Sequence, residues 1–434
     1  MTFMYTLDAL RSGALAGAKH VRLSGLTAFP EALYDLADTL EVLDLGGSQL
    51  THLPDDFARL KRLKILFGSN NPFETLPPVL GRCEALEMVG FKSCRIREVP
   101  SEALPPRLRW LILTDNRLES LPQSLGDCVA LQKLMLAGNR LTALPEAMQN
   151  CRALELVRLA ANQFETLPVW LSQLPRLSWL ALAGNPFAAR AEAALTHVPV
   201  ADIAWSDLSL GDVLGEGASG TTHLAQLSAG DLSRPVAVKI FKGAMTSDGL
   251  PQSEMAACVA AGRHEGLIPV LGRVRGHPDG RDALVMERID PDWRVLAGPP
   301  NFETCTRDVY ADGVRFDVGT ALGIAQQIAS AAAHLHSRGI LHGDLYAHNI
   351  LHDGRGRACL GDFGAASAYD PADRTQAEAL QRLEVRAFGC LLDELTRLCD
   401  APEALKRLTA ACVDVPRNRP LFPEIVESLA AIAG

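Results

Sequence analysis

The stretch His342-Gly343-Asp344-Leu345-Tyr346-Ala347-His348-Asn349 carries an acid and an amide, and Asp362-Phe363-Gly364 follows with a second acid. An aspartate can accept the proton of a hydroxyl that attacks a phosphate, whereas Asn and Asp oxygens are ligands that Mg²⁺ prefers. The short apolar runs 350–351 and 358–360 predict small strands, which would hold these groups on strand-edged loops. The stretch therefore indicates phosphoryl-transfer chemistry, with Asp344, Asn349 and Asp362 as its polar groups.

Length, charge and composition limit the classes of protein. A chain of 434 residues with 48% hydrophobic content predicts two or three domains with cores of their own. A net charge of −9 argues against nucleic acid or an anionic membrane as the main partner. Neither a leader-like start nor an apolar run long enough to span a membrane is present, so we expect a cytoplasmic protein. The ten cysteines are expected to be buried, reduced thiols.

The N-terminal part of the sequence repeats itself. The pattern Leu-x-x-Leu-x-Leu-x-x-Asn-x-Leu-x-x-Leu-Pro opens at leucines 22 or 23 residues apart, namely Leu40, Leu63, Leu86, Leu108, Leu131, Leu154 and Leu177. This period is typical of leucine-rich repeats, in which each unit buries its leucines only against its neighbours. The asparagines of the pattern are expected to satisfy the backbone of the turn that leaves each strand. Ser48 and Cys94 replace the asparagine in two repeats.

One face of this repeat domain is predicted to be apolar. The strand residues between the leucines would lie on the concave side, and they are Ile65, Phe67, Met88, Trp110, Ile112, Met135, Leu156 and Trp179. An apolar patch of this extent on a protein surface usually marks a partner-binding site. Lys92, Lys133 and Arg158 would shield part of it. The partner is either another protein or the C-terminal half of the same chain.

The C-terminal half contains further motifs in a fixed order. Gly215, Gly217 and Gly220 lie between two strand-like runs, where glycines let backbone N–H groups approach phosphates. Lys239 ends the apolar run Val-Ala-Val-Lys, and Glu254 follows on a predicted helix. With the two acidic loops, these motifs resemble the protein kinase family. The resemblance implies that the glycines cover the triphosphate of ATP, that Lys239 binds its phosphates and that Glu254 positions Lys239; Asp248 is a weaker candidate for that acid.

The resemblance extends to both ends of this half. Met286, Glu287 and Arg288 resemble the hinge strand that reads the adenine edge, with Met286 at the back of the pocket. The helix around 383–395 resembles the buried helix of the C-terminal lobe, with Glu384 where the family has Asp. The region 412–422 resembles the late Arg-Pro helix signature. The family would then use Asp344 to take the proton of the acceptor hydroxyl, and Asn349 with Asp362 to hold Mg²⁺.

Several positions depart from the family pattern. Gly343 replaces an arginine that reads an activating phosphate, and Tyr346 replaces the usual lysine two residues after Asp344. Only 22 residues separate Asp362 from Glu384, and no Ala-Pro-Glu occurs between them. The platform that docks a peptide substrate is therefore expected to be short. Asp373 is a candidate to replace its acid by meeting Arg419.

These observations predict a multidomain protein, with an N-terminal α/β leucine-rich-repeat horseshoe and a C-terminal α+β bilobal, protein-kinase-like fold. The expected limits are a capping segment 1–20, about eight repeats over 21–195, a linker 196–202 and the kinase-like domain 203–434. Whether the two domains touch is left open by the sequence.

The function expected is that of an ATP- and Mg²⁺-dependent protein kinase, with serine/threonine as the acceptor, and with repeats that bind a protein or regulate the kinase. Two alternatives remain. The His-Gly-Asp-Leu run also occurs in small-molecule kinases of the aminoglycoside and choline kinase type. An ATP-binding pseudokinase scaffold organised by the repeats is the other. Fold resemblance alone does not decide among them.

Overall fold

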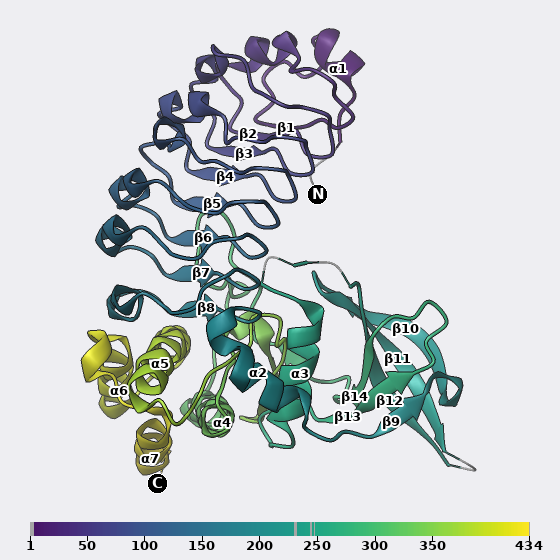
Figure 1. The fold of residues 1–434 in the computed structure, drawn as a ribbon. Coiled ribbons are helices and arrows are strands. Elements are labelled where there is room, and N and C mark those ends of the chain that lie inside the picture. Colours follow the sequence, from purple (N-terminus) through teal and green to yellow (C-terminus); the bar gives the residue numbers. More distant parts are fainter. Residues whose placement is uncertain (1–3, 230–231, 244, 247, 434) are drawn as a thin grey trace. The chain divides into compact units, whose positions relative to one another are not determined.

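The computed structural model describes residues 4–229, 232–243, 245–246 and 248–433. The chain divides into two compact units (Figure 1). The first unit comprises Met1–Val157 and Ala161–Leu174, and the second comprises Arg158–Ala160 and Pro175–Gly434. The predicted limits 21–195, 196–202 and 203–434 describe the sequence pattern and stay predictions. In the structure, residues 175–202 belong to the same compact unit as the kinase-like region.

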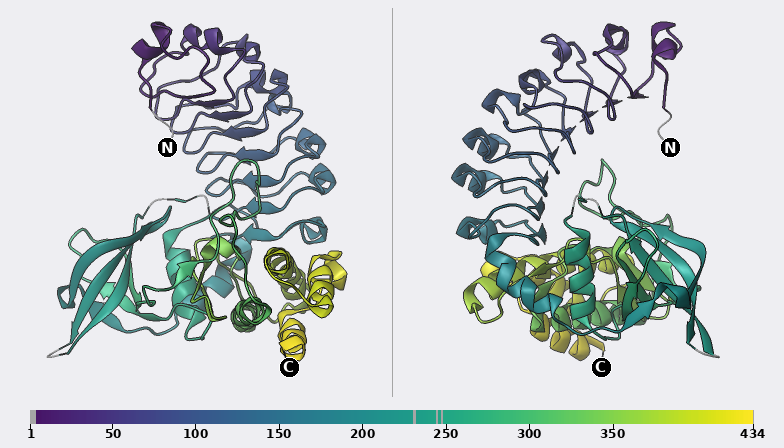
Figure 2. Two further views of the ribbon diagram at one scale, coloured as in Figure 1. Left: turned by 180° about the vertical axis from the view of Figure 1, so that it is seen from behind. Right: turned by 45° about the vertical axis from the view of Figure 1, so that its right-hand side comes forward.

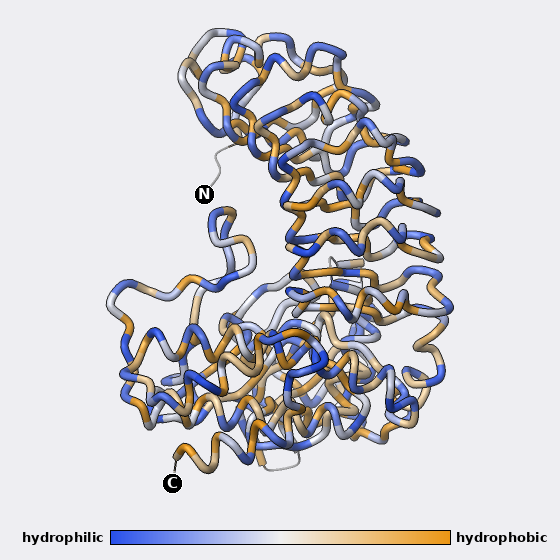
Figure 3. Tube along the Cα trace, turned by 90° about the vertical axis from the view of Figure 1, so that its left-hand side faces the viewer, coloured by the Kyte–Doolittle hydropathy of each residue, from blue (hydrophilic) through white to orange (hydrophobic). Residues whose placement is uncertain are grey.

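The repeats form short parallel strands joined by 3₁₀ helices. Helix α1 (Leu7–Arg11), capped by the Thr6 hydroxyl, precedes them. The strands follow one another in sequence order in one sheet: β1 His20–Arg22, β2 Val42–Asp44, β3 Ile65–Phe67, β4 Met88–Gly90, β5 Trp110–Ile112, β6 Lys133–Met135, β7 Leu156–Arg158 and β8 Trp179–Ala181. The 3₁₀ helices are Glu31–Leu36, Phe57–Arg59, Pro78–Arg82, Ser101–Ala103, Gln123–Asp127, Glu146–Asn150, Val169–Gln173 and Pro186–Ala188. Figure 3 shows hydrophobic and hydrophilic stretches alternating along these coils. The repeat architecture predicted from the sequence is confirmed.

The asparagines of the repeats bond to the turn backbone as predicted. Asn71 accepts from the amide of Leu50 at 2.8 Å and donates to the carbonyl of Leu45 at 3.0 Å. Its counterparts Asn116 and Asn139 bond in the same way. Where the sequence departs, Ser48 still accepts from the amide of Leu26 at 3.1 Å. These side chains satisfy amides and carbonyls that the short strands leave unpaired inside the coil.

The second unit contains a six-stranded sheet in the order β10-β11-β12-β14-β13-β9. The strands are β9 Asp202–Ala204, β10 Leu208–Glu216, β11 Gly220–Ala229, β12 Leu232–Phe241, β13 Val270–Arg275 and β14 Ala283–Glu287. The apolar run predicted around Lys239 lies in β12. Val236 and Val238 of this strand belong to the buried apolar cluster of the sheet. Helix α3 (Pro251–Ala261) packs on the same cluster as Phe241 of β12. The first lobe of a kinase-like fold is therefore present.

The second unit also contains further helices. They are α2 Ala189–Thr196, α4 Val318–Ser337, α5 Arg374–Arg397, α6 Glu403–Val413 and α7 Phe422–Ala433. Small sheets hold the acidic loops: β15 Arg294–Val295, β17 Ile350–His352 and β18 Ala358–Leu360 form one, and β16 Ile340–Leu341 pairs with β19 Ser367–Ala368 in another. Short 3₁₀ turns occur at Trp205–Asp207, Ala347–Asn349 and Pro416–Asn418. Within this unit the larger sheet and the helices α4 to α7 form separate parts (Figure 2). The bilobal α+β fold is confirmed.

Candidate functional site

The lysine of β12 and the glutamate of α3 form an ion pair. Lys239 Nζ bonds to Glu254 Oε1, and the Glu254 side chain is 2% exposed. Burial lowers the pKa of Lys239, but the charges of Glu254 and Asp362 outweigh it and raise the pKa. The amine therefore stays protonated at neutral pH. Glu254, not Asp248, is the partner of Lys239, as the sequence favoured.

The glycine-rich turn lies between β10 and β11. The amide of Gly217 donates to the carbonyl of Gly220 at 2.9 Å, which closes the turn. A side chain at Gly220 would place its Cβ 2.5 Å from the carbonyl oxygen of Ile240, so only glycine fits there. The space around the Cβ positions of Gly215 and Gly217 is open. The lack of side chains at Gly215 and Gly217 would let a phosphate chain approach the backbone of this turn, which is the role that the sequence predicts.

The first acidic loop follows β16. Asn349 donates its side-chain amide to Asp344 Oδ2 at 2.8 Å and to the Asp344 carbonyl at 2.9 Å. His348 is fixed by Asp308, whose carboxylate accepts from the ring Nδ1 at 2.7 Å and from the backbone amide at 3.1 Å. Burial would lower the pKa of His348, but Asp308 outweighs it and raises the pKa. Nothing in the sequence singled out Asp308, because it lies 40 residues before the loop that it holds.

The second acidic loop turns back on the first. Asp362 adopts a left-handed backbone conformation, with φ of 52°, and accepts from the Gly364 amide at 3.1 Å. The ring of Phe363 packs against His342, whose Nε2 lies 2.8 Å from the carbonyl of Gly361. Strained backbone of this kind persists where the surroundings determine it. Asp362 is exposed, whereas Phe363 next to it is buried.

Glu384 of α5 fixes the start of the first acidic loop. Its carboxylate accepts from the amide of Gly343 at 2.6 Å and meets the ring of His336 at 2.7 Å. Burial would raise the pKa of Glu384, but His336, His342 and the Gly343 amide outweigh it and lower the pKa. The longer glutamate therefore performs the anchoring that the resemblance assigns to an aspartate at this position.

The strand predicted to form the hinge is β14 with the residues after it. Met286 packs against the apolar cluster of Phe241, Met255 and Leu284. Glu287 pairs with Val236 of β12, and its carboxylate meets Arg263 at 3.3 Å. Arg288 is exposed. Met286 is thus the one member of this group that lies toward the apolar interior, whereas the adenine-reading role of the three residues stays a prediction.

The segment between the second acidic loop and α5 is short. After β19 only residues 369–373 precede the helix, and Asp373 caps it by accepting from the Gln376 amide at 3.1 Å. The expected contact of Asp373 with Arg419 is wrong. Arg419 instead donates to the carbonyls of Asp414, Arg382 and Pro175 at 2.8 to 2.9 Å. The guanidinium of Arg419 is thus bound by backbone carbonyls and not by Asp373.

The last repeat, residues 175–184, packs on the catalytic loop within the second unit. The Trp179 ring stacks on Tyr346 with centroids 4.1 Å apart, and its Nε1 donates to the carbonyl of Leu345 at 3.0 Å. The amide of Leu182 donates to Ser367 at 2.8 Å. With 1% of its surface exposed, Trp179 contacts the chain's own catalytic loop, which is one of the two partners considered from the sequence.

The other residues of the predicted concave face lie in β3 to β7. Phe67, Trp110, Ile112 and Met135 are partly exposed, and Trp110 donates its Nε1 to the Met135 sulfur at 3.3 Å. Ile65, Met88 and Leu156 are buried. Partner binding by these residues stays a prediction.

Arg158, at the end of β7, is the residue whose role the sequence did not reveal. Its Nε donates to Asp248 Oδ1 at 2.7 Å, its Nη1 donates to the carbonyl of Gly343 at 3.0 Å, and its Nη2 pairs with Asp344 Oδ1. Its side chain is 2% exposed. The sequence had placed it only as a shield of the concave face. The available signal was that residues 342–349 contain neither arginine nor lysine, so that a cation to pair with Asp344 had to come from another part of the chain.

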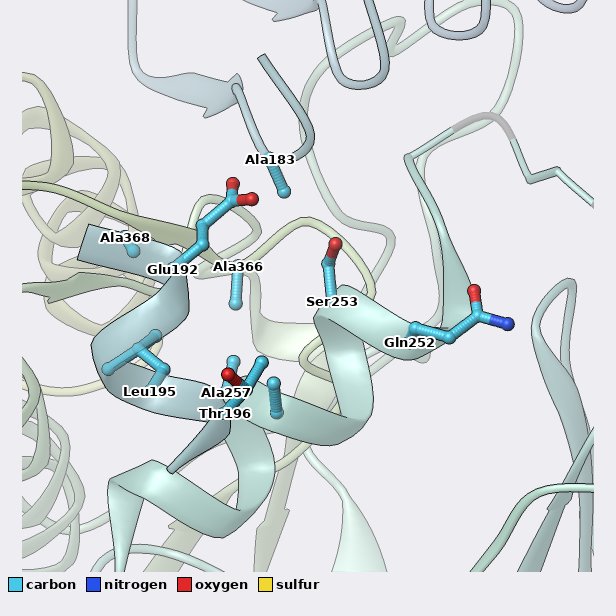
Figure 4. Close-up of a pocket in the computed structure, with 10 residues that line it drawn as sticks. Ala183, Glu192, Leu195, Thr196, Gln252, Ser253, Ala257, Ala366 and Ala368 are labelled. Carbon is cyan, nitrogen blue, oxygen red and sulfur yellow. The ribbon is translucent and has the colours of Figure 1, made fainter. Parts of the chain in front are cut away.

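A small pocket lies between α2, α3 and residues 366–368 (Figure 4). It has a volume of about 110 Å³, and most of its lining side chains are small, among them Ala183, Ala256 and Ala366. Glu192 points into it and accepts from the Gly184 amide at 2.7 Å. None of the predicted nucleotide-binding residues lines this pocket, and it is too small for a nucleotide.

Glu394 of α5 gives a prediction on pH and stability. Burial, then the charge of Asp308, raises the pKa of Glu394 from 4.5 to about 8. Between these two pH values the folded state binds more protons than the unfolded state, so the free energy of unfolding falls as pH rises. Glu394→Gln can still accept a hydrogen bond from Tyr310. We expect its free energy of unfolding to rise relative to that of wild type by up to about 2 kcal/mol between pH 5 and pH 9.

The check is thermal unfolding of both proteins across pH 5 to 9, with Glu403→Gln as the control at an exposed position of α6. Parallel pH profiles of wild type and Glu394→Gln would show that Glu394 has an ordinary pKa.

Comparison with known proteins identifies the parts of the chain. Residues 208–390 match the family model described as protein tyrosine and serine/threonine kinase, and residues 106–164 and 130–187 match the leucine rich repeat model. The chain therefore carries a protein kinase domain with leucine-rich repeats N-terminal to it. In the part of the chain that the structure describes, no helix has the length and apolar character needed to cross a membrane.

The relatives are kinases by name. CBL-interacting protein kinase 22 of Oryza sativa subsp. japonica is 33% identical over 170 residues, which are 38% of this chain and 37% of that protein. Cyclin-dependent kinase 11.1 of Caenorhabditis elegans is 27% identical over 191 residues, 43% of this chain and 25% of that protein. Fibroblast growth factor receptor 1 of Pleurodeles waltl is 25% identical over 279 residues, 51% of this chain and 34% of that protein. The chain thus spans 25 to 37% of the length of these relatives.

A kinase domain implies ATP and, as a rule, Mg²⁺, and the residues present fit both. The side-chain amide nitrogen of Asn349 is committed to Asp344, which leaves its oxygen for a cation. Asp362 offers an exposed carboxylate. Lys239, paired with Glu254, provides a cation for phosphate oxygens. Hard oxygen donors and a fixed amine are the set that a Mg²⁺-bound polyphosphate requires.

Proposed function

We propose that this chain is an ATP-dependent protein kinase that transfers the γ-phosphate to serine or threonine hydroxyls, and that its repeats bind a protein partner. The observation that supports this most is the coexistence of two intact polar pairs in one compact unit. Lys239 is paired with Glu254, and Asp344 is fixed by Asn349. Phosphoryl transfer depends mainly on positioning and electrostatic stabilisation, and both pairs serve those purposes.

Each residue has a definite task in this proposal. Gly215, Gly217 and Gly220 form the backbone turn that covers the triphosphate, and Lys239 binds its oxygens. Asn349 and Asp362 hold Mg²⁺, which supplies neutralisation of the phosphate charge. Asp344 orients the acceptor hydroxyl and takes its proton as the bond to phosphorus forms. Its side chain keeps 18% of its surface exposed, which leaves an edge for that hydroxyl.

The family description covers tyrosine and serine/threonine kinases alike. The proposal that the acceptor is serine or threonine therefore rests on the sequence resemblance of the loops. The repeats are proposed to select the protein that carries the acceptor. Their partly exposed apolar residues Phe67, Trp110 and Met135 are of types enriched in interfaces. Selection by a separate surface suits a kinase domain whose own peptide platform is short.

A second candidate, a pseudokinase scaffold, is favoured by one observation. Both carboxylate oxygens of Asp344 already accept hydrogen bonds from the chain, one from Asn349 and one from Arg158. Each oxygen retains a second lone pair, so that these bonds leave acceptor capacity for a hydroxyl. A small-molecule kinase has no comparable support in the structure.

Transfer of labelled γ-phosphate distinguishes the candidates. The purified chain is incubated with Mg·ATP and a mixture of proteins, and the labelled products are hydrolysed to identify the phosphorylated amino acid. We expect phosphoserine and phosphothreonine, and none above background with Asp344→Asn. Phosphotyrosine alone would overturn the acceptor class. Bound ATP without any incorporation would favour the scaffold.

A further inference from the structure

The carboxylate of Asp344 is clamped from two directions. Asn349, five residues further along the same loop, donates to Oδ2 at 2.8 Å. Arg158, which lies 186 residues earlier in the sequence, pairs with Oδ1. A carboxylate that bonds at both oxygens has its plane and its rotamer fixed, which is what a group that must meet a hydroxyl requires.

Arg158 is itself held in a single orientation. Its guanidinium donates to three acceptors, on Asp248, Gly343 and Asp344, which come from two separate loops. Burial would lower the pKa of Arg158, but Asp344 and Asp248 outweigh it and raise the pKa, so the group is a permanent cation. A planar donor that bonds to three fixed acceptors cannot turn without breaking one of them.

Neither Gly343 nor Tyr346, the two positions where the loop departs from the kinase pattern, provides a cation next to Asp344. Gly343 has φ of 73°, and a Cβ there would lie 2.5 Å from the carbonyl oxygen of Ala365 and 2.7 Å from that of Leu180. A larger residue is thus excluded by the last repeat and by the second acidic loop. Tyr346 is neutral, and its ring is covered by Trp179. The guanidinium that pairs with Asp344 therefore comes from Arg158 at the end of β7.

The contact between Arg158 and Asp344 is supported by other buried contacts nearby. Four further anchors fix the last repeat to the kinase domain within the second unit. They are Trp179 on Leu345, Leu182 on Ser367, Arg386 on Ser178 and Arg419 on Pro175. Removing Arg158 from Asp344 by opening the structure would expose all of these buried groups at once. An open state would therefore be rarely populated.

We infer that Arg158 is a positioning residue of the phosphoryl-transfer centre, which fixes the carboxylate of Asp344 for the acceptor hydroxyl. This inference rests on the proposed kinase function.

The test compares Arg158→Met, Arg158→Lys and wild type by steady-state phosphoryl transfer, with Arg140→Met as the matched control. Arg140 lies on an exposed part of the repeats, 3.7 Å from Glu119. We expect Arg158→Met to lower kcat by about 10- to 100-fold while KM for ATP changes less than about threefold, because the carboxylate is misplaced and the nucleotide site is untouched. Arg158→Lys should recover part of the loss, since one charge returns without the three-way geometry.

Unchanged or increased kcat in Arg158→Met would overturn the inference, and an increase would identify the contact as inhibitory. If Arg158→Met fails to fold, Asp248→Asn tests the inference instead. This change removes the charge of one partner of the Arg158 guanidinium and keeps the shape of the side chain. We then expect lower kcat with KM for ATP retained, and unchanged kcat would overturn the inference. Absence of transfer by wild type would instead mean that the proposed function fails, and the positioning role with it.

Discussion

Lys239→Met is expected to reduce phosphoryl transfer by at least about 100-fold, because a fixed cation on the phosphates is lost from a site that acts by electrostatic stabilisation. The change also leaves Glu254, with 2% of its side chain exposed, without its ion-pair partner. A buried carboxylate in this state responds by taking up a proton. The fold should persist, since β12 keeps its strand pairing with β11 and β14.

The measurement is the initial rate of transfer of labelled phosphate, with circular dichroism to verify folding. Lys406→Met, at an exposed position of α6 in the same unit, is the control for loss of a lysine charge. A wild-type rate in Lys239→Met would show that the site has been assigned to the wrong residues.

Trp179→Ala is expected to destabilise the second unit by about 3–5 kcal/mol, the usual loss for a large aromatic side chain removed from a core. The ring is 1% exposed, stacks on Tyr346 and donates to the Leu345 carbonyl. Its removal leaves a cavity beside the catalytic loop and a carbonyl without its donor. Phosphoryl transfer should fall as well, because Tyr346 lies two residues after Asp344.

Urea unfolding of the full chain measures this loss, and Trp110→Ala provides the matched control. Trp110 is partly exposed in the first unit, where Lys133 lies 4.2 Å from the centre of its ring. We expect it to lose only about 1–2 kcal/mol. Equal losses in the two variants would contradict the assignment of Trp179 to the core of the second unit.

Local patterns in the sequence were sufficient for the architecture and for the central residues. The 22- or 23-residue period follows directly from a coil that buries its leucines against its neighbours. Only 15 residues separate Lys239 from Glu254, and only 5 separate Asp344 from Asn349. Each pair therefore belongs to one short stretch of sequence. Spacing of that kind is visible without a structure.

Contacts across long sequence distances were not predictable in the same way. Arg158 and Asp344 are 186 residues apart, and Trp179 lies 166 residues before Leu345, whose carbonyl accepts its hydrogen bond. No periodicity connects such positions, because packing of the whole unit selects them. The error over Asp373 has the same origin, since it assumed an acid as the partner of Arg419, whereas Arg419 donates to backbone carbonyls, one of them that of Pro175. Gly343 and Tyr346 were nevertheless a usable hint that a cation had to come from elsewhere.

The most direct test of the central claim is single-turnover transfer of γ-phosphate from Mg·ATP by the wild-type chain and by Asp344→Asn, measured side by side. Asn keeps the size of the side chain and loses the carboxylate that takes the proton and pairs with Arg158. The proposed function predicts measurable transfer by wild type and a loss of at least about 100-fold in Asp344→Asn, with ATP still bound by both. Equal transfer by the two proteins, or no transfer by wild type, would contradict it.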